Sequence, residues 1–442
     1  MSDALQWLSE QVNRSGDRYI QLLRDLVRVS QDGEGATQAW VAAKLRALGC
    51  DVDHLRYSPI DLAPKYEFVQ ATTVDPGEHV CVVGKLAGEN RGSSLLLFAH
   101  PDVEPVTSIG GWRHAPFAGE IEGGRLYGWG VADDLLGVAT MVCALMALSA
   151  AGRRPRGTVI LASTPSKRHA RGIVAVLDRG YAADGAVYLH PAESGRGLRD
   201  IKAITSGLLR FRISIDGRPP DTQEPEQTPF HHLAVNPIEK AWVLIRALQA
   251  LNEDRSGRVR HPIFEEAVGR STNIQLAHVH GGDAEHLNRI SRACVLAGSA
   301  TLPPLERMED VQSEIAQSIE TAAKADPWLR DHPPRLEWLL GVRGAEVPLD
   351  HPVYGAVSRA IRAVTGYEPR ANALHAASDI RHPILHAGIP TVGYGPLAGN
   401  FSQAGGTDEW IDVADYLQAV MVTGRLILEW CGVQEVGQGL AH

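Results

Sequence analysis

The sequence has no excess of basic residues. Its 442 residues include 43 lysines and arginines against 52 aspartates and glutamates, which gives a formal net charge of -9. Proteins that bind nucleic acids usually carry a basic surface, so we expect no nucleic-acid partner. The five cysteines are odd in number, and no two of them form a CxxC pair. We therefore expect neither a disulfide framework nor a cysteine zinc site.

Long apolar runs and internal repeats are also missing. No stretch of about 18 apolar residues is present, so we expect no segment that spans a membrane. The N-terminal segment MSDALQWLSE has neither the basic start nor the apolar centre of a secretory signal. Hydrophobic residues make up 44% of the chain and charged residues 21%, which is ordinary for a globular protein. These features predict a cytoplasmic protein that is long enough for two domains.

Short apolar runs alternate with longer helical stretches over much of the chain. An apolar helix is expected at residues 135–148, and another helix at residues 352–365. The runs with the length and branching of buried strands are HVCVVGKL, SSLLLFA, GTVILAS and GAVYL. Strands that alternate with helices predict an α/β fold with a largely parallel sheet.

A different pattern begins near residue 208. The segment LRFRISIDG alternates apolar and polar residues, as a strand with one wet face does. A helix from Pro237, two alternating segments and a helix at residues 309–325 follow it. The order β-α-β-β-α predicts a small α+β domain. We place it at residues 208–328, inserted between the two parts of the α/β domain at residues 1–207 and 329–442, because the Pro-rich segment DPWLRDHPP marks its end.

Polar residues follow three of the predicted strands. SSLLLFA is followed by His100, GTVILAS by Ser166 and Lys167, and GAVYL by His190. Ligands of open α/β sheets bind at the carboxyl ends of strands. Together with Asp133, which opens the apolar helix, two histidines suit a divalent metal such as zinc. The alternatives are structural histidines and a simple helix cap at Asp133.

Longer motifs surround these residues. They are LLLFAHPDVEPV, PFAGEIEGGRLYGWGVADDLLG, VNPIEKA, ISRACVL and ASDIRHPILHAGIPTVGYGP. The combination resembles the acetylornithine deacetylase, succinyl-diaminopimelate desuccinylase and carboxypeptidase G family of zinc aminoacyl-peptidases, over nearly the whole chain. The resemblance implies a zinc-exopeptidase-like three-layer α/β domain. It also implies that the inserted α+β domain is ferredoxin-like and joins two subunits into a homodimer.

The resemblance implies a metal site that is only half retained. His100 matches the family's first histidine ligand and Asp133 its bridging aspartate. His190 stands where the family has an acidic ligand, and histidine can replace it. The metal candidates are therefore His100, Asp133 and His190, and the cofactor is one zinc ion, another divalent metal, or none.

The family's second metal site and its general base are replaced. Ser166 and Lys167 stand at the positions of a catalytic glutamate and a glutamate ligand, and Gly405 at that of a late histidine, with Gln403 the nearest side chain. Loss of a general base typically costs about 10²–10⁴ in rate. Lys167 either occupies the place of the missing metal, where its charge partly replaces the metal's field, or faces solvent.

Further departures fall in the inserted domain and near the C-terminus. The family's histidine that reaches across the dimer falls on Asp221, and His231 and His232 are the candidates to replace it. Arg381 can pair with a substrate carboxylate or form a structural salt bridge. The candidates for substrate binding are Asn288, Ser378, Asp379 and Arg381.

Three functions remain open on these residues. The first, which we favour, is a repurposed enzyme that acts on an amide or an amino-acid-like small molecule with one metal or none. It would transfer, cyclise or condense instead of hydrolysing, because the attacking water has lost its activator. The second is an inactive homologue that serves as a binding or scaffolding protein. The third is an ordinary metal-dependent amidohydrolase.

Overall fold

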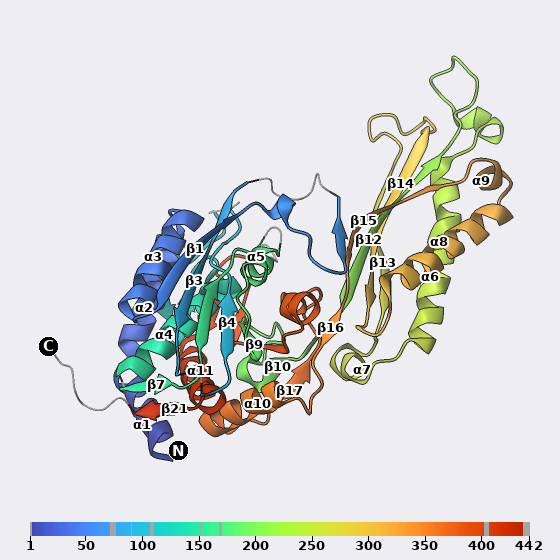
Figure 1. Ribbon diagram of the computed structural model, residues 1–442. Helices are drawn as coiled ribbons and strands as arrows, with labels where there is room; N and C mark the ends of the chain where they lie inside the picture. The colour runs from blue at the N-terminus through green and yellow to red at the C-terminus, as the bar shows by residue number, and fades with distance from the viewer. Residues whose placement is uncertain are drawn as a thin grey trace. The chain divides into compact units, whose positions relative to one another are not determined.

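The chain folds into two compact units, which the computed structural model in Figure 1 shows. The structure describes residues 2–70, 77–89, 91–106, 110–150, 152–167, 170–401 and 406–435. The first unit comprises residues 1–65, 73–204 and 346–442, and the second unit residues 66–72 and 205–345. Their elements confirm the expected fold class, an α/β fold with an α+β part inserted into it.

The first unit is built on an 8-stranded sheet in the order β1-β3-β8-β4-β9-β18-β10-β17. Strands β8, β4, β9 and β18 run parallel to one another. The strands are β1 (Asp51–Tyr57), β3 (His79–Leu86), β8 (Val159–Ser163), β4 (Leu95–Ala99), β9 (Gly185–Leu189), β18 (Thr391–Tyr394), β10 (Asp200–Lys202) and β17 (Arg370–Asn372). Because the central strands are parallel, their carboxyl ends meet at one edge of the sheet.

Helices cover both faces of this sheet (Figure 1). On β4, Leu95 and Leu97 pack into one core cluster, whereas Leu96 and Phe98 pack into another on the opposite face. The first face is covered by α1 (Ser2–Arg14), α2 (Gly16–Ser30), α3 (Glu34–Ala47), α4 (Leu136–Ala150), α10 (Pro352–Thr365) and α11 (Val413–Cys431), and the second by α5 (Gly172–Asp178). Burial of both faces explains why these strands are continuously apolar in sequence.

Shorter elements complete the first unit. A 4-stranded sheet has the order β19-β20-β6-β5, and β21 pairs with β7. These strands are β19 (Ala398–Gly399), β20 (Trp410–Asp412), β6 (Arg125–Tyr127), β5 (Glu120–Glu122), β21 (Val433–Glu435) and β7 (Arg153–Pro155). The short helical turns are η1 (Pro59–Asp61), η3 (Val131–Leu135), η4 (Gly197–Arg199) and η6 (Pro383–Ala387). The short strands β11 (Ile204–Thr205) and β16 (Ala345–Glu346) pair with each other, and each has one residue in either unit.

The second unit is a 5-stranded antiparallel sheet in the order β13-β14-β12-β15-β2. Its core forms between this sheet and the helices α6 and α8. Its elements are β2 (Glu67–Val69), β12 (Gly207–Asp216), η5 (Thr228–Leu233), α6 (Pro237–Arg258), α7 (Pro262–Val268), β13 (Asn273–Gly281), β14 (Ala293–Leu302), α8 (Met308–Ala325), α9 (Pro327–Asp331) and β15 (Arg335–Val342). Apart from the short helices, the order from β12 to β15 is that of a ferredoxin-like fold.

The second unit extends further than the boundary expected at residue 328. Strand β15 belongs to it because it pairs along most of its length with β12. Strand β2 adds a further edge, by pairing with β15 near Leu340. Both strands join this sheet through partners that are distant in sequence. The Pro-rich segment after residue 326 therefore forms the short helix α9 and the connection to β15 within the second unit, and is not its end.

One stretch among the described residues, Val131–Ala150, is long and apolar enough to cross a membrane by length and composition alone. It consists of η3 and α4, and 94% of its apolar window is buried inside the structure. A helix that is apolar on every side belongs either in a membrane or in a protein core. Here the sheet and α11 surround it, so its composition is that of a core helix.

Candidate active site

Four polar side chains that follow different strands meet in the first unit. His100 follows β4, Lys167 follows β8, His190 follows β9, and Asp133 lies in the turn η3. Asp133 Oδ1 lies 2.9 Å from His100 Nε2 and 3.1 Å from His190 Nε2. Lys167 Nζ donates a hydrogen bond to Asp133 Oδ2. We call these four residues the strand-end cluster, and Asp133 is its centre.

The strand-end cluster is almost completely buried. Asp133 and His190 are each 1% exposed and His100 is 4% exposed. Burial disfavours the charged carboxylate of Asp133, but the hydrogen bonds from His100 and His190 and the charge of Lys167 outweigh it and hold its pKa well below the usual range. Burial likewise disfavours a charged His100, yet Asp102 and Asp133 raise its pKa well above the usual range. Asp133 is thus a buried carboxylate whose charge is compensated by neighbouring cations.

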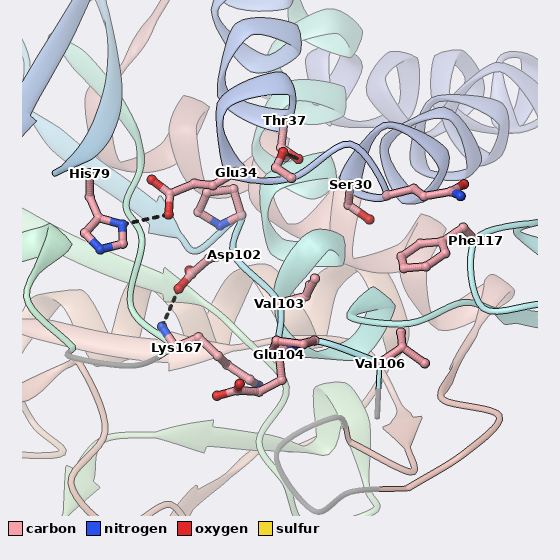
Figure 2. A pocket seen from close by; sticks show the side chains of 14 residues that line it. Ser30, Glu34, Thr37, His79, Asp102, Val103, Glu104, Val106, Phe117 and Lys167 are labelled. Carbon is pink, nitrogen blue, oxygen red and sulfur yellow. Dashed lines mark hydrogen bonds and ion pairs between the residues drawn. The ribbon is translucent and has the colours of Figure 1, made fainter. Parts of the chain in front are cut away.

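The loop that carries Lys167 is held in place by Asp102. The Asp102 carboxylate accepts hydrogen bonds from the backbone N–H of Ser166 at 2.8 Å and of Lys167 at 2.7 Å. The same carboxylate lies 3.5 Å from His100 Nδ1. Figure 2 shows Asp102 between Lys167 and the ion pair of Glu34 with His79. Asp102 therefore fixes both His100 and the backbone on which the ammonium group of Lys167 is mounted.

Lys167 lines a pocket of about 390 Å³ (Figure 2). The pocket lies among α2, α3, β3 and the loop after β4. Its charged lining is Glu34, Asp102, Glu104 and Lys167, with His79 beside them. The side chain of Lys167 is only 5% exposed, and its ammonium group contacts Asp133 and is shielded from bulk water. Lys167 is therefore a residue of the pocket wall whose charge is buried beside Asp133.

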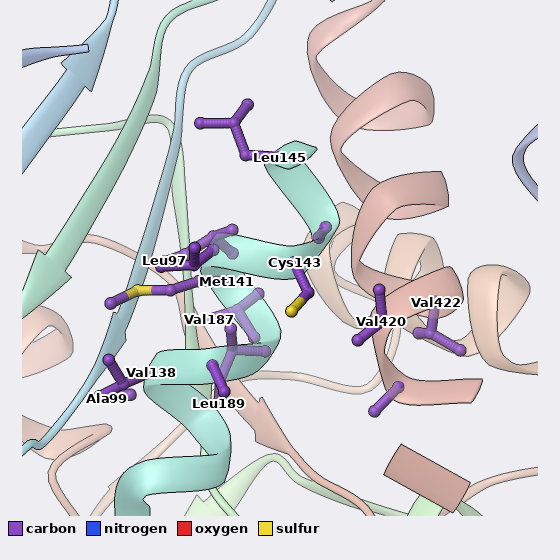
Figure 3. Close-up of a cluster of buried hydrophobic side chains, with 14 of the residues drawn as sticks. Leu97, Ala99, Val138, Met141, Cys143, Leu145, Val187, Leu189, Val420 and Val422 are labelled. Atoms are coloured by element: carbon purple, nitrogen blue, oxygen red, sulfur yellow. The ribbon is translucent and has the colours of Figure 1, made fainter. Parts of the chain in front are cut away.

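The turn that presents Asp133 is fixed from both sides. The Glu409 carboxylate accepts hydrogen bonds from the backbone N–H groups of Gly130, Ala132 and Asp133, at 2.9, 2.8 and 3.1 Å. Burial raises the pKa of Glu409 to about 8, against the effect of these hydrogen bonds. Helix α4 begins directly after the turn, and Figure 3 shows its side chains between those of the sheet and those of α11. Asp133 is thus mounted on a rigid part of the fold.

A second polar group, which the sequence did not reveal, adjoins the strand-end cluster. Lys202, at the end of β10, is 1% exposed, and its Nζ lies 2.7 Å from His190 Nδ1 and 2.7 Å from His375 Nδ1. Glu193 Oε2 lies 3.2 Å from His375 Nδ1. Burial lowers the pKa of Lys202 to about 8, although Glu193 and nearby aspartates oppose the shift. Lys202 follows no long apolar run, so no sequence pattern marked it.

Ser166, which stands at the position expected for the family's general base, has a hydroxyl that is already hydrogen-bonded within the fold. Ser166 Oγ donates a hydrogen bond to Asp379 Oδ2, and Asp379 Oδ1 lies 3.4 Å from Arg381 Nη1. Arg381 also donates to the carbonyl of Ala377. These side chains, together with Ser378, are buried near the strand ends. The contacts support a structural salt bridge for Arg381, and its role in substrate binding stays a prediction.

Three other predicted site residues belong to the second unit. His231 and His232 lie on the exposed turn η5, where His231 Nε2 is 3.4 Å from Glu239 Oε1. Asn288 Nδ2 donates a hydrogen bond to the carbonyl of Pro225 at 3.1 Å. Their proposed roles stay predictions. The positions Gln403 and Gly405 lie outside the described residues.

The donor types of the strand-end cluster suit one divalent metal. His100, Asp133 and His190 present three possible ligand atoms within 4.8 Å of one another, and two imidazoles with one carboxylate are ordinary zinc donors. A second ion bridged by Asp133 does not fit. Its oxygen Oδ2 already holds the ammonium of Lys167, and an ammonium group has no lone pair to offer a metal.

Comparison with known proteins places this sequence in a family. The sequence matches peptidase family M20/M25/M40 over residues 96–429. It is 24% identical to the N-formyl-4-amino-5-aminomethyl-2-methylpyrimidine deformylase of Halalkalibacterium halodurans, over 96% of this chain and 97% of the relative. It is 28% identical to a succinyl-diaminopimelate desuccinylase of Methylobacterium radiotolerans, over 93% of this chain and 96% of the relative.

Solved structures agree with this placement. A dipeptidase of Saccharomyces cerevisiae has a TM-score of 0.71 at 12% identity, over 98% of this chain and 99% of the dipeptidase. A dinuclear metal-binding peptidase of family M20 from Bacillus subtilis has a TM-score of 0.59 at 15% identity, over 95% of this chain and 99% of that peptidase. At these identities the likeness shows the fold alone. Since the family match spans most of the sequence, as its motifs predicted, the chain belongs to peptidase family M20/M25/M40.

Proposed function

We propose that the first unit carries an enzyme site for amide chemistry on a small, amino-acid-like substrate, with at most one metal ion. The observation that carries this proposal is the hydrogen bond from Lys167 to Asp133. It fixes a positive charge beside Asp133, on a residue that lines the pocket. If one ion binds, it is held by His100, Asp133 and His190, and it would supply a Lewis acid.

Lys167 can stabilise negative charge that develops on a substrate oxygen. An ammonium group has three donors, and Asp133 uses one of them in the described contacts. The remaining donors can reach a carbonyl oxygen in the pocket that Lys167 lines. Because the Lys167 ammonium is shielded from bulk water and held by Asp133, such a contact would act at the developing oxyanion with little reorganisation.

Position 166 carries no carboxylate that could take a proton from an attacking water molecule. This side chain is a hydroxyl, and Asp379 already accepts its hydrogen bond. We therefore propose that the nucleophile is an amine of a substrate. Its nitrogen attacks the acyl carbon, the original C–N bond breaks, and the departing amine takes the proton that the attacking amine loses. The acyl group is thereby transferred, or a ring closes when the attacking amine and the acyl group belong to one molecule and the other amine departs.

The relatives support an N-acylated amine as the substrate class. By their names, one of them removes a formyl group from an aminopyrimidine and another a succinyl group from diaminopimelate. Both groups are attached to nitrogen through an amide. For this chain we propose an N-acyl compound of similar size, bound without nucleic acid or membrane. A homodimer and a cytoplasmic location stay predictions from the sequence.

Lys167→Met is expected to reduce turnover by about 10²–10³-fold, as the loss of one preorganised oxyanion donor does in other enzymes. The assay offers the purified chain N-formyl, N-acetyl and N-succinyl amino acids, each with and without a free amine acceptor, and mass spectrometry follows the products. In the wild type we expect faster acyl transfer to the amine than to water. The matched control is Lys65→Met, a change of an exposed lysine in the same unit.

Two outcomes would contradict this function. Hydrolysis that is as fast without an amine as with one would favour an ordinary amidohydrolase. Tight binding of these compounds without turnover would favour the binding protein, which the occupied hydrogen bonds of Ser166 make the second candidate. Calorimetric titration with the same compounds distinguishes binding without turnover from the absence of any interaction.

A further inference from the structure

Lys202 occupies the centre of a second group of metal-ligand type. His190, Glu193 and His375 offer ligand atoms that all lie within 4.8 Å of one another. Two histidines and a glutamate are the protein ligands of several zinc enzymes. However, Lys202 Nζ lies 2.7 Å from Nδ1 of both histidines. One nitrogen atom thus takes the place where an ion bound to these two rings would lie.

The same lysine also determines which nitrogen of His190 carries a proton. An ammonium group only donates hydrogen bonds, so His190 Nδ1 must accept one from Lys202. The proton of the neutral ring then resides on Nε2, which faces Asp133 Oδ1 at 3.1 Å. Metal binding through Nε2 would require the opposite tautomer, with the proton on Nδ1.

The carbonyl of Pro191 does not restore that tautomer. It lies 2.9 Å from His190 Nδ1 and could accept a proton from it. In that case the N–H of the ring and the ammonium of Lys202 would be two donors directed at each other across 2.7 Å. Lys202 therefore disfavours His190 as a ligand in the strand-end cluster as well as in the second group.

Lys167 disfavours metal binding by Asp133, as Lys202 does for His190. Its ammonium is hydrogen-bonded to Oδ2, the oxygen that would bind a second ion. Each lysine has a carboxylate nearby to balance its charge, since Lys167 contacts Asp133 and Glu193 attracts Lys202. We infer that two buried lysine ammonium groups take the places of metal ions in this site, and that the native protein holds no metal there.

This inference rests on the proposed location of the site and not on the proposed reaction. It reduces the expected number of bound metal ions from at most one to none. It also gives Lys202 a role as a positioning residue, because it acts through His190 and has no described contact with the pocket that Lys167 lines.

The experiment is to measure zinc in the full-length protein after incubation with zinc chloride and desalting. We expect no stoichiometric zinc in the wild type and no zinc-dependent change in its melting temperature. Lys202→Met removes the ammonium and keeps a side chain of similar length. It is expected to bind one equivalent of zinc and to gain several degrees in Tm when zinc is added. Adding His375→Ala to Lys202→Met should abolish the acquired zinc, and Lys65→Met should behave as the wild type.

Two results would overturn the inference. One is wild-type protein that retains one equivalent of zinc and loses it in His190→Ala. The other is folded Lys202→Met that takes up no zinc. If Lys202→Met does not fold, calorimetric titration of the wild type with zinc decides, because binding of one equivalent overturns the inference and its absence supports it. A metal-free wild type without amide turnover would contradict only the proposed function, whereas a zinc-loaded active protein would contradict only this inference.

Discussion

Asp133→Asn is expected to lower the free energy of unfolding by about 3–5 kcal/mol, as does the removal of one partner from other buried ion pairs. Asp133 is 1% exposed and accepts a hydrogen bond from Lys167, which is itself shielded from water. The substitution keeps the shape of the side chain but removes its charge. Lys167 and His100 would then lie buried beside an amide that cannot balance them. Urea denaturation followed by circular dichroism measures the change.

A matched control for Asp133→Asn is Asp25→Asn. Asp25 also pairs with a cation, Arg28, but both side chains are about half exposed. Exposed pairs contribute about 0–1 kcal/mol, so this variant should unfold close to the wild type. Equal stabilities of Asp133→Asn and the wild type would contradict a buried ion pair at Lys167. They would also weaken the argument that an ammonium has replaced a metal at that oxygen.

Arg255→Met is expected to destabilise the second unit by about 3–5 kcal/mol, for the same physical reason. Arg255 is completely buried on α6, although it carries a full charge. Its guanidinium donates to Glu306 at 2.7 Å, to Glu314, and to the hydroxyl of Thr272 at 3.1 Å. Methionine fills part of the space but leaves the two carboxylates without their common partner.

Hydrogen exchange followed by mass spectrometry can locate this effect. Peptides from α8 and β14, in the second unit, should exchange faster in Arg255→Met, because local opening costs less free energy there. Arg258→Met is the matched control, since Arg258 lies on the same helix and also contacts Glu314 but is 45% exposed. If both variants exchange alike, burial of Arg255 is not what stabilises this unit.

The sequence predicted those parts of the site that follow directly from the strands. The strands β4, β8 and β9 are buried along their whole length, and the apolar continuity of their sequences marks them as strands. Because β4, β8 and β9 are parallel neighbours, the residues after them had to converge. For this reason His100 and His190 lie close together, whereas the direction of the Lys167 side chain was left open by the sequence.

Lys202 could not be predicted in this way. Its strand has three residues, and its pairing partners β17 and β18 lie more than 150 residues later in the chain. The burial of Lys202 is therefore a product of long-range pairing and leaves no local periodicity. The same holds for β15, whose pairing with β12 places it in the second unit. Local patterns predict an element, whereas its burial and its partners depend on the assembled sheet.

The family resemblance located positions but could not assign their chemistry. It placed Ser166 and Lys167 where glutamates are expected, and left open whether the lysine faces solvent. The contacts of Lys167 with Asp133 and of Ser166 with Asp379 decide that both side chains point into the fold. A substitution at a ligand position is informative only once its new partner is known.

The place of β18 in the sheet has a consequence for synthesis on the ribosome. This strand, Thr391–Tyr394, lies between β9 and β10, which are complete about 190 residues earlier in the chain. Until β18 emerges, the edge of β9 that it later pairs with has no partner strand, and the side chains of β9 are apolar. Unpaired strand edges of this kind promote incorrect association of nascent chains. Glu409, which fixes the turn of Asp133, emerges later still. The turn that presents Asp133 can therefore be fixed by Glu409 only when translation is nearly finished. Until then, a chaperone would have the edge of β9 to protect.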